Sequence, residues 1–282
     1  MNVRAGAVVA LLLLSCASGV HAAPPAPTAH SPDTTRTKTM IPDDKTTLTY
    51  ERGCIARGPR HRKRVALEFT GGDYADGAAK VLDELDLRGI KGSFFLTGGF
   101  LAKPEFRPHV RRMIDGGHYL GPHSDAHPLY ATWDEPPKLT ITRADFDADL
   151  DRNMAKLVVL GVPAAKARYF IPPYEHWTLE ISAWTAARGM TLINMSRGTR
   201  SHTDYMEDDD PRFVTADDIA KSILDREAVD PDGLNGFLLL LHVGASLRRT
   251  RDHGYDKLGG LIDELARRGY SFVRIDDLIE GR

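Results

Sequence analysis

The stretch Gly117-His-Tyr-Leu-Gly-Pro-His123-Ser-Asp-Ala-His127-Pro-Leu-Tyr130 carries two histidines four residues apart, just after a short apolar segment. If a helical turn begins after that segment, His123 and His127 point from the same face. Two imidazoles on one face, joined by a carboxylate from elsewhere, form a site for a divalent transition metal with coordination positions left open. The spacing alone is a weak signal, because two solvated loop histidines would look the same.

Around this stretch, apolar strand-like segments alternate with amphipathic helical segments. Strands are expected at 65–69, 92–97, 118–120, 168–171, 190–194, 236–241 and 271–275, and helices around 81–85, 106–114, 142–158, 179–188, 217–227 and 258–265. This alternation predicts an α/β fold with a parallel sheet and outer helices. About seven units fit a (β/α) barrel that is distorted or incomplete, and an open doubly wound sheet is the alternative.

The N-terminal segment is expected to lie outside the folded domain. In residues 1–22, Arg4 precedes the apolar run 5–14, and a small-residue site ends at Ala22, which is typical of a secretory signal peptide. Residues 23–44 are rich in Pro, Thr, Ala and Ser and read as a disordered linker. The catalytic domain is then 45–282, exported to the periplasm or secreted.

A second interpretation of the leader involves Cys16. The segment Leu13-Leu14-Ser15-Cys16 resembles a bacterial lipoprotein box, in which Cys16 would carry a lipid anchor, the one membrane contact expected of this chain. Leu14 is unusual at the second position of such a box, so soluble export is favoured. In the exported protein Cys16 would be either removed with the signal peptide or lipidated. Cys54 then has no partner cysteine, and no intrachain disulfide is expected.

Composition limits the classes of partner. The chain has 282 residues, of which 42% are hydrophobic, enough for one large domain or two small ones. Its net charge is −2 and it has no block of basic residues, so nucleic acid is not an expected partner.

Reactive side chains follow the C-terminal ends of the predicted strands. They are Asp73 and Asp76 after the first strand, His123 and His127 after the third, Tyr174 and Glu175 after the fourth, Asn194 at the end of the fifth and His242 at the end of the sixth. This edge of a (β/α) barrel is where active sites are built.

Taken together, these stretches resemble the polysaccharide deacetylase family, the metal-dependent de-N- and de-O-acetylases of carbohydrate esterase family four. The resemblance covers roughly 64–279. The segment 123–127 matches the family's His-(Ser/Thr)-x-x-His motif at every fixed position, and Leu241-His242 matches the Leu-His that supplies the general acid. The resemblance implies a divalent metal, most simply Zn²⁺ with Co²⁺ or Ni²⁺ as alternatives, and a carbohydrate substrate.

Two departures from the family pattern are informative. Aligning Phe69 with the family's Thr-Phe-Asp-Asp-Gly places Thr70 and Gly71 where the two aspartates belong. In 170–174, Ile171 stands where the family has the Arg of Arg-x-Pro-Tyr. In the family this Arg holds the base Asp, and without that partner it would be a poorly compensated charge. The paired losses indicate a divergent branch with a rearranged base; a pseudo-enzyme that keeps a sugar groove is the alternative.

We expect Asp73, His123 and His127 to be the metal ligands, although Asp73 also suits a simple turn. Glu175 and Asp76 are the candidate bases, and capping of the next helix is the alternative role for Asp76.

His242 ends an apolar strand and is the expected general acid, with a satisfied core histidine as the alternative; Asp204 is a candidate to orient it. Pro173, Tyr174 and Trp177 are expected to contact the substrate, Tyr174 through its backbone N–H as in the family. Trp133 is a second candidate stacking platform, and Trp184, inside a predicted helix, is expected to belong to the core.

The sequence therefore predicts a metal-dependent hydrolase that removes N- or O-linked acetyl groups from a polysaccharide or oligosaccharide of the cell envelope or environment. Two alternatives stay open: a non-catalytic glycan-binding protein, and a metal-dependent hydrolase of another amide or ester.

Overall fold

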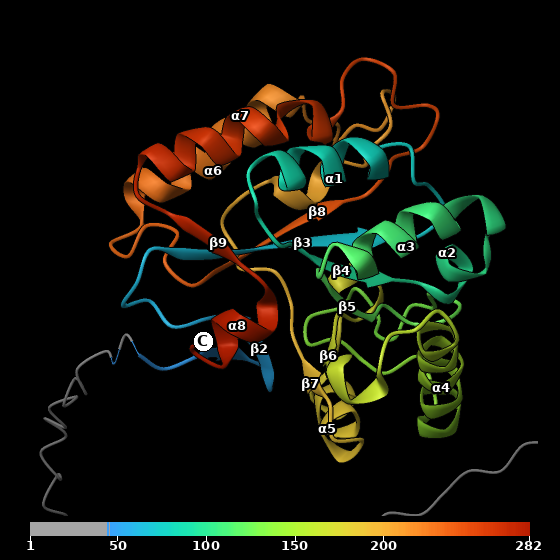
Figure 1. Cartoon of the computed structure of the whole chain (residues 1–282). Helices are drawn as coiled ribbons and strands as arrows, with labels where there is room; N and C mark the ends of the chain where they lie inside the picture. The colour runs from blue at the N-terminus through green and yellow to red at the C-terminus, as the bar shows by residue number, and fades with distance from the viewer. Residues whose placement is uncertain (1–43, 45) are drawn as a thin grey trace, which may run out of the picture. The chain divides into compact units, whose positions relative to one another are not determined.

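Parallel strands form the centre of the fold in the computed structural model, which describes residue 44 and residues 46–282 (Figure 1). Four strands pair in the order β5-β4-β3-β8, and β9 pairs with the beginning of β3. The strands β6 and β7 form a separate parallel pair. The bounds are β3 (Arg64–Gly71), β4 (Ser93–Leu96), β5 (Tyr119–Pro122), β6 (Tyr169–Phe170), β7 (Thr191–Leu192), β8 (Phe237–His242) and β9 (Ser271–Val273).

The two parallel sheets are joined into one incomplete barrel. Between β5 and β6, the Tyr169 N–H donates to the Tyr119 hydroxyl at 2.8 Å. Between β7 and β8, the Ser196 N–H donates to the Leu238 carbonyl at 2.9 Å. The N-terminal hairpin of β1 (Thr49–Glu51) and β2 (Cys54–Arg57) lies beside β7 through a bridge at Ile55. The prediction of a distorted or incomplete (β/α) barrel is confirmed.

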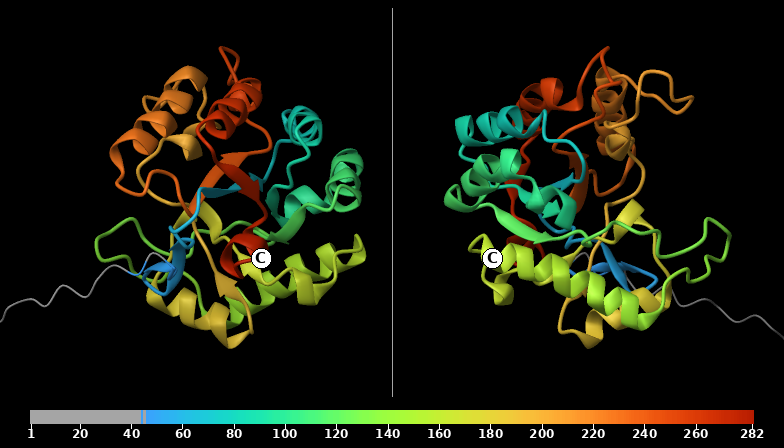
Figure 2. Two further views of the ribbon diagram at one scale, coloured as in Figure 1. Left: turned by 60° about the vertical axis from the view of Figure 1, so that its left-hand side comes forward. Right: turned by 90° about the vertical axis from the view of Figure 1, so that its right-hand side faces the viewer.

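Helices surround the strands, as the three views in Figures 1 and 2 show. The longest, α4, begins at the predicted cap, where the Thr142 hydroxyl accepts the Asp145 N–H at 3.2 Å. Two five-residue helices, α2 and α8, were not predicted from the sequence. The bounds are α1 (Ala78–Leu87), α2 (Gly98–Ala102), α3 (Arg107–Asp115), α4 (Arg143–Val159), α5 (Leu179–Ala187), α6 (Ala216–Val229), α7 (Gly254–Arg267) and α8 (Ile275–Ile279).

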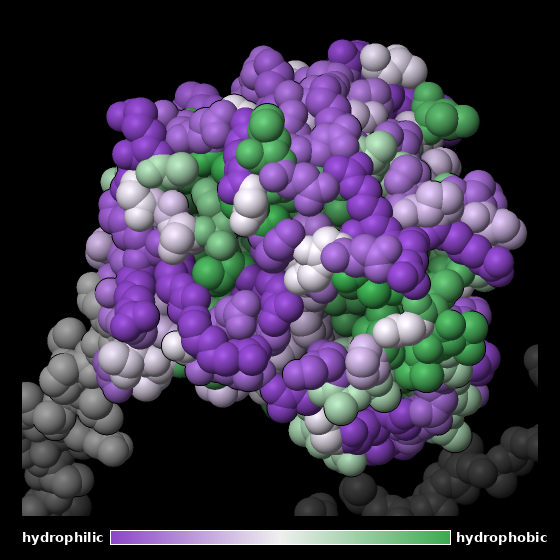
Figure 3. All heavy atoms as spheres, viewed as in Figure 1, coloured by the Kyte–Doolittle hydropathy of each residue, from purple (hydrophilic) through white to green (hydrophobic). Residues whose placement is uncertain are grey.

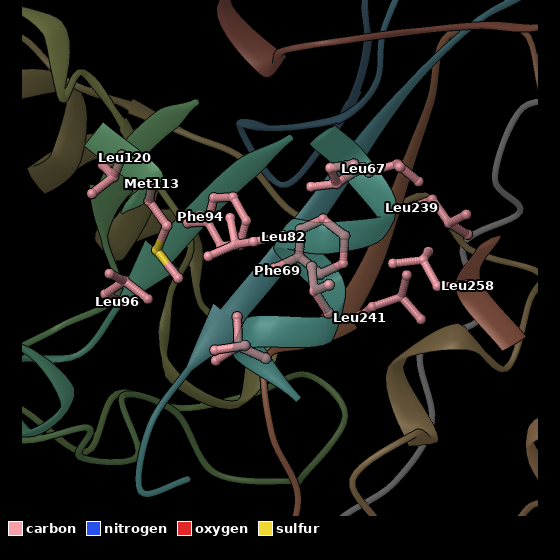
Figure 4. Close-up of a cluster of buried hydrophobic side chains, with 14 of the residues drawn as sticks. Leu67, Phe69, Leu82, Phe94, Leu96, Met113, Leu120, Leu239, Leu241 and Leu258 are labelled. Atoms are coloured by element: carbon pink, nitrogen blue, oxygen red, sulfur yellow. The ribbon is translucent and has the colours of Figure 1, made fainter. Parts of the chain in front are cut away.

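The sheet has a hydrophobic cluster on each face, because successive strand residues point to opposite sides. Leu67 and Phe69 pack outward against the helices (Figure 4). Ala66 belongs to the cluster inside the barrel. By the same alternation, Glu68 and Thr70 face the barrel interior, and both are buried.

The predicted signal peptide, Cys16 and all of the predicted linker except Asp44 lie outside the described residues. None of the helices in residues 44 and 46–282 combines the length and the hydrophobicity needed to cross a bilayer. On the face shown in Figure 3, hydrophilic residues predominate, and hydrophobic residues gather below the positions of α2 and α3.

Leu82 and Leu87 provide a matched test of the core on α1. Leu82 is 0% exposed and Leu87 is 78% exposed. We expect Leu82→Ala to lower the free energy of unfolding by about 2–5 kcal/mol, because it removes buried methyl groups and leaves a cavity. Leu87→Ala should change it by less than about 0.5 kcal/mol. Chemical denaturation measures both, and equal losses would contradict this packing.

Candidate active site

A cavity of about 1010 Å³ opens at the carboxyl ends of the barrel strands. Segments that follow β3, β5, β6, β7 and β8 all contribute to its wall, as the sequence predicted for this edge of the barrel. The lining side chains used below are Thr70, Asp73, His123, His127, Trp133, Tyr174, Glu175, Asn194 and His242.

His123 and His127 meet in this cavity, but not through a helical turn. The expected turn is wrong: Ser124 has φ 71° and His127 has φ 54°, both in the left-handed region. The His127 N–H donates to the Ser124 hydroxyl at 3.0 Å, which closes the loop. The two Nε2 atoms nevertheless lie 3.2 Å apart, so the imidazoles converge as a metal pair requires.

A buried carboxylate on α4 holds this loop in place. Asp149 accepts the Ser124 O–H at 2.6 Å and the N–H groups of Asp125 and Ala126 at 2.9 Å each. Sequence reasoning missed Asp149, because an aspartate within an amphipathic helix is ordinarily solvated. The available signal was its position beside Leu150, on the buried side of the predicted helix.

Both imidazoles are neutral at ordinary pH. Burial first, and then the neighbouring His127, hold the pKa of His123 well below its usual value. Burial lowers the pKa of His127 to about 4. The Nδ1 of His123 lies 2.9 Å from the Ile171 carbonyl, which can only accept, so we place the His123 proton on Nδ1. The His123 Nε2 lone pair therefore faces the cavity, the form in which histidine binds a metal.

The imidazole pair fits a divalent cation. Two bonds of about 2.05 Å to one tetrahedral Zn²⁺ separate their donor atoms by about 3.3 Å. The Nε2–Nε2 distance of 3.2 Å agrees with this value. Among residues 44 and 46–282, however, no three His, Cys, Asp or Glu side chains stand in coordinating positions around one point. The pair therefore provides two ligands.

Neither carboxylate of the β3 loop contacts this pair, although Asp73 lines the same cavity and its charge acts on His127. The Asp73 side chain is 86% exposed, with its nearest charged partner, Lys103, at 3.7 Å. Asp76 accepts the Ala245 N–H at 2.8 Å and the Tyr255 O–H at 2.9 Å, so both of its oxygens are used in joining this loop to the segment after β8. The prediction of Asp76 as base is wrong for that reason. Its alternative role is also absent, since the N-cap residue of α1 is Gly77 and no side chain caps the helix.

Glu175 is the carboxylate that lies beside the imidazoles. Its Oε1 is 3.9 Å from the His123 Nε2, and its side chain is 15% exposed. Burial raises the pKa of Glu175 to about 7, against the opposing charge of His242. The backbone is held by Asn194, whose side-chain amide donates to the Glu175 carbonyl at 2.8 Å.

His242 is paired with Asp204 as the sequence suggested. The Nδ1 of His242 lies 2.6 Å from Asp204 Oδ1, and the His242 N–H donates to Oδ2 at 2.9 Å. Burial alone would lower the pKa of His242, but the Asp204 carboxylate outweighs it, by charge and by hydrogen bonding, and Glu175 adds to the rise. The net pKa lies above 6.5, which suits a proton donor near neutral pH.

The end of β3 is tightly packed around Gly71. A Cβ on Gly71 would lie 2.7 Å from Leu96 Cδ2 and 3.0 Å from Val243 Cγ2. Within the described chain, the buried Thr70 hydroxyl and both oxygens of Glu68 have no hydrogen-bond partner. Burial, followed by the charge of Glu175, raises the pKa of Glu68 to about 8, so Glu68 is a neutral acid below the cavity floor.

The predicted substrate contacts are only partly in place. Pro173 is buried and Tyr174 is half-exposed on the cavity wall. The prediction for Trp177 is wrong: it is 1% exposed, and its indole N–H donates to the Arg52 carbonyl at 3.3 Å. Trp133, the other tryptophan considered as a stacking platform, does reach the cavity. It is 68% exposed, lines the cavity and stacks on His176 with ring centroids 4.5 Å apart.

Residues 57–193 match the family model described as Polysaccharide deacetylase. A peptidoglycan-N-acetylglucosamine deacetylase of Bacillus cereus is 26% identical over 226 residues, which cover 79% of this chain and 70% of the relative. A chitooligosaccharide deacetylase of Bradyrhizobium is 27% identical over 225 residues, 77% of this chain and 90% of the relative. Among solved structures, a family 4 carbohydrate esterase pseudoenzyme of Bacillus anthracis superposes with a TM-score of 0.62 at 18% identity, covering 82% of this chain and 70% of that one.

Replacing Asp204 by Asn tests the coupling to His242. We expect the pKa of His242 to fall below 6.5, because burial would then be opposed by Glu175 alone. An NMR titration of the imidazole nitrogens measures this shift directly.

The same pair predicts a pH dependence of stability. Because the folded-state pKa of His242 lies above the unfolded value of about 6.5, its contribution is fully present below that pH and is lost as the pH rises through the folded-state pKa. Urea unfolding across this pH range should show the loss of stability in the parent protein and not in Asp204→Asn. An equal decline in both would contradict the pairing.

Proposed function

Because the chain belongs to the polysaccharide deacetylase family of hydrolases, we propose that it removes acetyl groups from a carbohydrate by metal-assisted hydrolysis. One observation carries the proposal: two neutral imidazoles converge in the same cavity that holds the His242–Asp204 pair. A Lewis-acid site and a proton donor on opposite strands are the two parts that acyl transfer to water needs most.

His123 and His127 would hold the metal, with Zn²⁺ the simplest choice for imidazole donors and Co²⁺ or Ni²⁺ as alternatives. When bound, such an ion polarises the acetyl carbonyl and acidifies a water molecule. The Ile171 carbonyl keeps the His123 ring oriented by accepting its Nδ1 proton, the usual device that fixes the tautomer of a ligating histidine.

His242 is the proposed general acid. Asp204 raises the pKa of His242 and orients its ring, so His242 can donate a proton to the departing amine or alkoxide. At the opposite rim, the exposed ring of Trp133 offers a flat apolar face of the kind on which pyranose rings stack, and Tyr174 extends that wall toward His127, with ring centroids 4.5 Å apart.

The proposed substrate is a glycan that contains N-acetylglucosamine, with an O-acetylated glycan as the alternative. The names of the Bacillus cereus and Bradyrhizobium relatives support this choice. We further propose that the protein acts outside the cytoplasm, on the basis of the signal-like residues 1–22, with lipidation of Cys16 as the alternative to soluble export.

A non-catalytic glycan-binding role is the second candidate. It is favoured by the loss of the β3 aspartates at Thr70 and Gly71, and by the likeness to a protein described as a pseudoenzyme. In that case the cavity would bind sugar without turnover.

Metal content and acetate release should rise and fall together. We expect protein stripped by a chelator to be inactive, and to recover acetate release from chitooligosaccharides or acetylated xylan when Zn²⁺, Co²⁺ or Ni²⁺ restores about one equivalent of metal. His123→Ala should lose both properties. Elemental analysis and an acetate assay on the same samples measure them, and a fully active, metal-free His123→Ala protein would refute the proposal.

His242→Gln should separate catalysis from binding. We expect kcat to fall about 10²–10⁴-fold, because the leaving group loses its proton donor, while metal content stays unchanged. An activated aryl acetate, which needs less protonation, should be less affected. His61→Gln on the exposed surface is the control. Glycan binding without turnover in both the parent and the variant would instead establish the non-catalytic role.

A further inference from the structure

In the described part of the chain the Glu175 carboxylate has no hydrogen-bond partner, and His242 is the cationic side chain whose charge acts on it. Neither of its oxygens accepts a hydrogen bond there, and the one close polar atom is the His123 Nε2 at 3.9 Å. A largely buried carboxylate that lacks donors is costly unless a cation neutralises it. His123 cannot serve as that cation while its Nε2 carries a lone pair. His123, His127 and Glu175 all line the same cavity, although the three side chains do not surround one point in the geometry described.

The backbone beneath this carboxylate is held in an unusual conformation. Tyr174 and Glu175 have φ values of 58° and 51°, two consecutive non-glycine residues in the left-handed region. The Asn194 side chain fixes the Glu175 carbonyl from β7, and the Glu175 N–H donates to the Pro172 carbonyl at 3.0 Å. Residues persist in such strained conformations when their surroundings impose them, and they concentrate at functional sites.

Two other carboxylates follow β3, and one of them, Asp73, lines the same cavity and acts on His127 through its charge. A side chain at Gly71 would require Leu96 and Val243 to shift, and the Asp73 side chain is 86% exposed. Asp76 is committed to Ala245 and Tyr255. Of the carboxylates at the strand ends, Glu175 is the one that combines burial, proximity to the imidazoles and a lack of hydrogen-bond partners.

We infer that Glu175 is the third protein ligand of the metal bound by His123 and His127, so that the carboxylate ligand comes from the end of β6 and not from the loop after β3. The set of two imidazoles and one carboxylate suits Zn²⁺ and leaves a position open for water and substrate. The 3.9 Å separation lies within a small side-chain rotation of the roughly 3.3 Å expected between ligands of one Zn²⁺. This role replaces the one of general base that the sequence suggested, and it rests on the proposed metal-dependent function.

The test is the affinity for Zn²⁺, measured by competition with a chromophoric chelator and independent of any activity. We expect Glu175→Gln, which keeps the shape and removes the charge, to weaken Zn²⁺ binding by at least about tenfold. Asp73→Asn alters the competing carboxylate and should stay within about twofold of the parent. Glu180→Gln, on the exposed side of α5, is the matched control for the chemical change. In Co²⁺-loaded protein, the visible absorption band should change in Glu175→Gln alone.

Glu175→Gly separates loss of the ligand from loss of the fold. Glycine adopts φ 51° freely, and the substitution also removes a largely buried carboxylate without a hydrogen-bond partner. We therefore expect the metal-free Glu175→Gly protein to melt at a higher temperature than the metal-free parent, while its Zn²⁺ affinity stays low.

The outcomes distinguish this inference from the proposed function. Unchanged Zn²⁺ affinity in Glu175→Gln, or a loss in Asp73→Asn instead, would overturn the role of Glu175 while leaving deacetylation intact. Zn²⁺ binding that depends on Glu175, without acetate release from any glycan, would support the inference and count against the activity. A parent protein that binds no Zn²⁺ would overturn both.

Discussion

The geometry of the site depends on one buried carboxylate outside it. Asp149 on α4 accepts three hydrogen bonds from the loop that carries the histidines, and these bonds hold Ser124 and His127 at positive φ. Left-handed conformations cost free energy for residues with a side chain, so the loop needs an external constraint to keep them. Charge-assisted hydrogen bonds in a dry environment are strong enough to supply it. The position of His127 is therefore set by the packing of a helix against the barrel.

The charged side chains at the bottom of the cavity differ from those that the family resemblance implies. The end of β3 offers a threonine and a glycine in place of two aspartates, and Ile171 replaces an arginine at the end of β6. These changes are consistent with one another, because a guanidinium without its carboxylate would be a buried unpaired charge. Glu68 lies deeper in the barrel with its pKa raised to about 8, whereas Glu175, with a pKa of about 7, lies 3.9 Å from the His123 Nε2.

Local sequence signals predicted the alternation of strands and helices, the Thr142 cap and the convergence of His123, His127 and His242 on one edge, because each depends on periodicity or on the position of a strand end. They failed where long-range packing decides. Trp177 is buried because its indole meets the β1–β2 turn, and Asp76 is occupied by partners that follow β8. Asp149 was missed because nothing in a helix pattern distinguishes an aspartate that caps a distant loop from a solvated one.

The barrel architecture explains how a residue that follows one strand can take the metal-ligand position of a residue that follows another strand. The carboxyl ends of parallel barrel strands surround one small area, so residues distant in sequence, such as Thr70, Glu175 and His242, line the same cavity. A carboxylate lost from β3 can be replaced from β6 if the backbone there turns the side chain inward. Positive φ at Tyr174 and Glu175 makes that turn, and Asn194 at the end of β7 holds it. The local cost is strain at two residues, which the bond from Asn194 and the surrounding packing maintain.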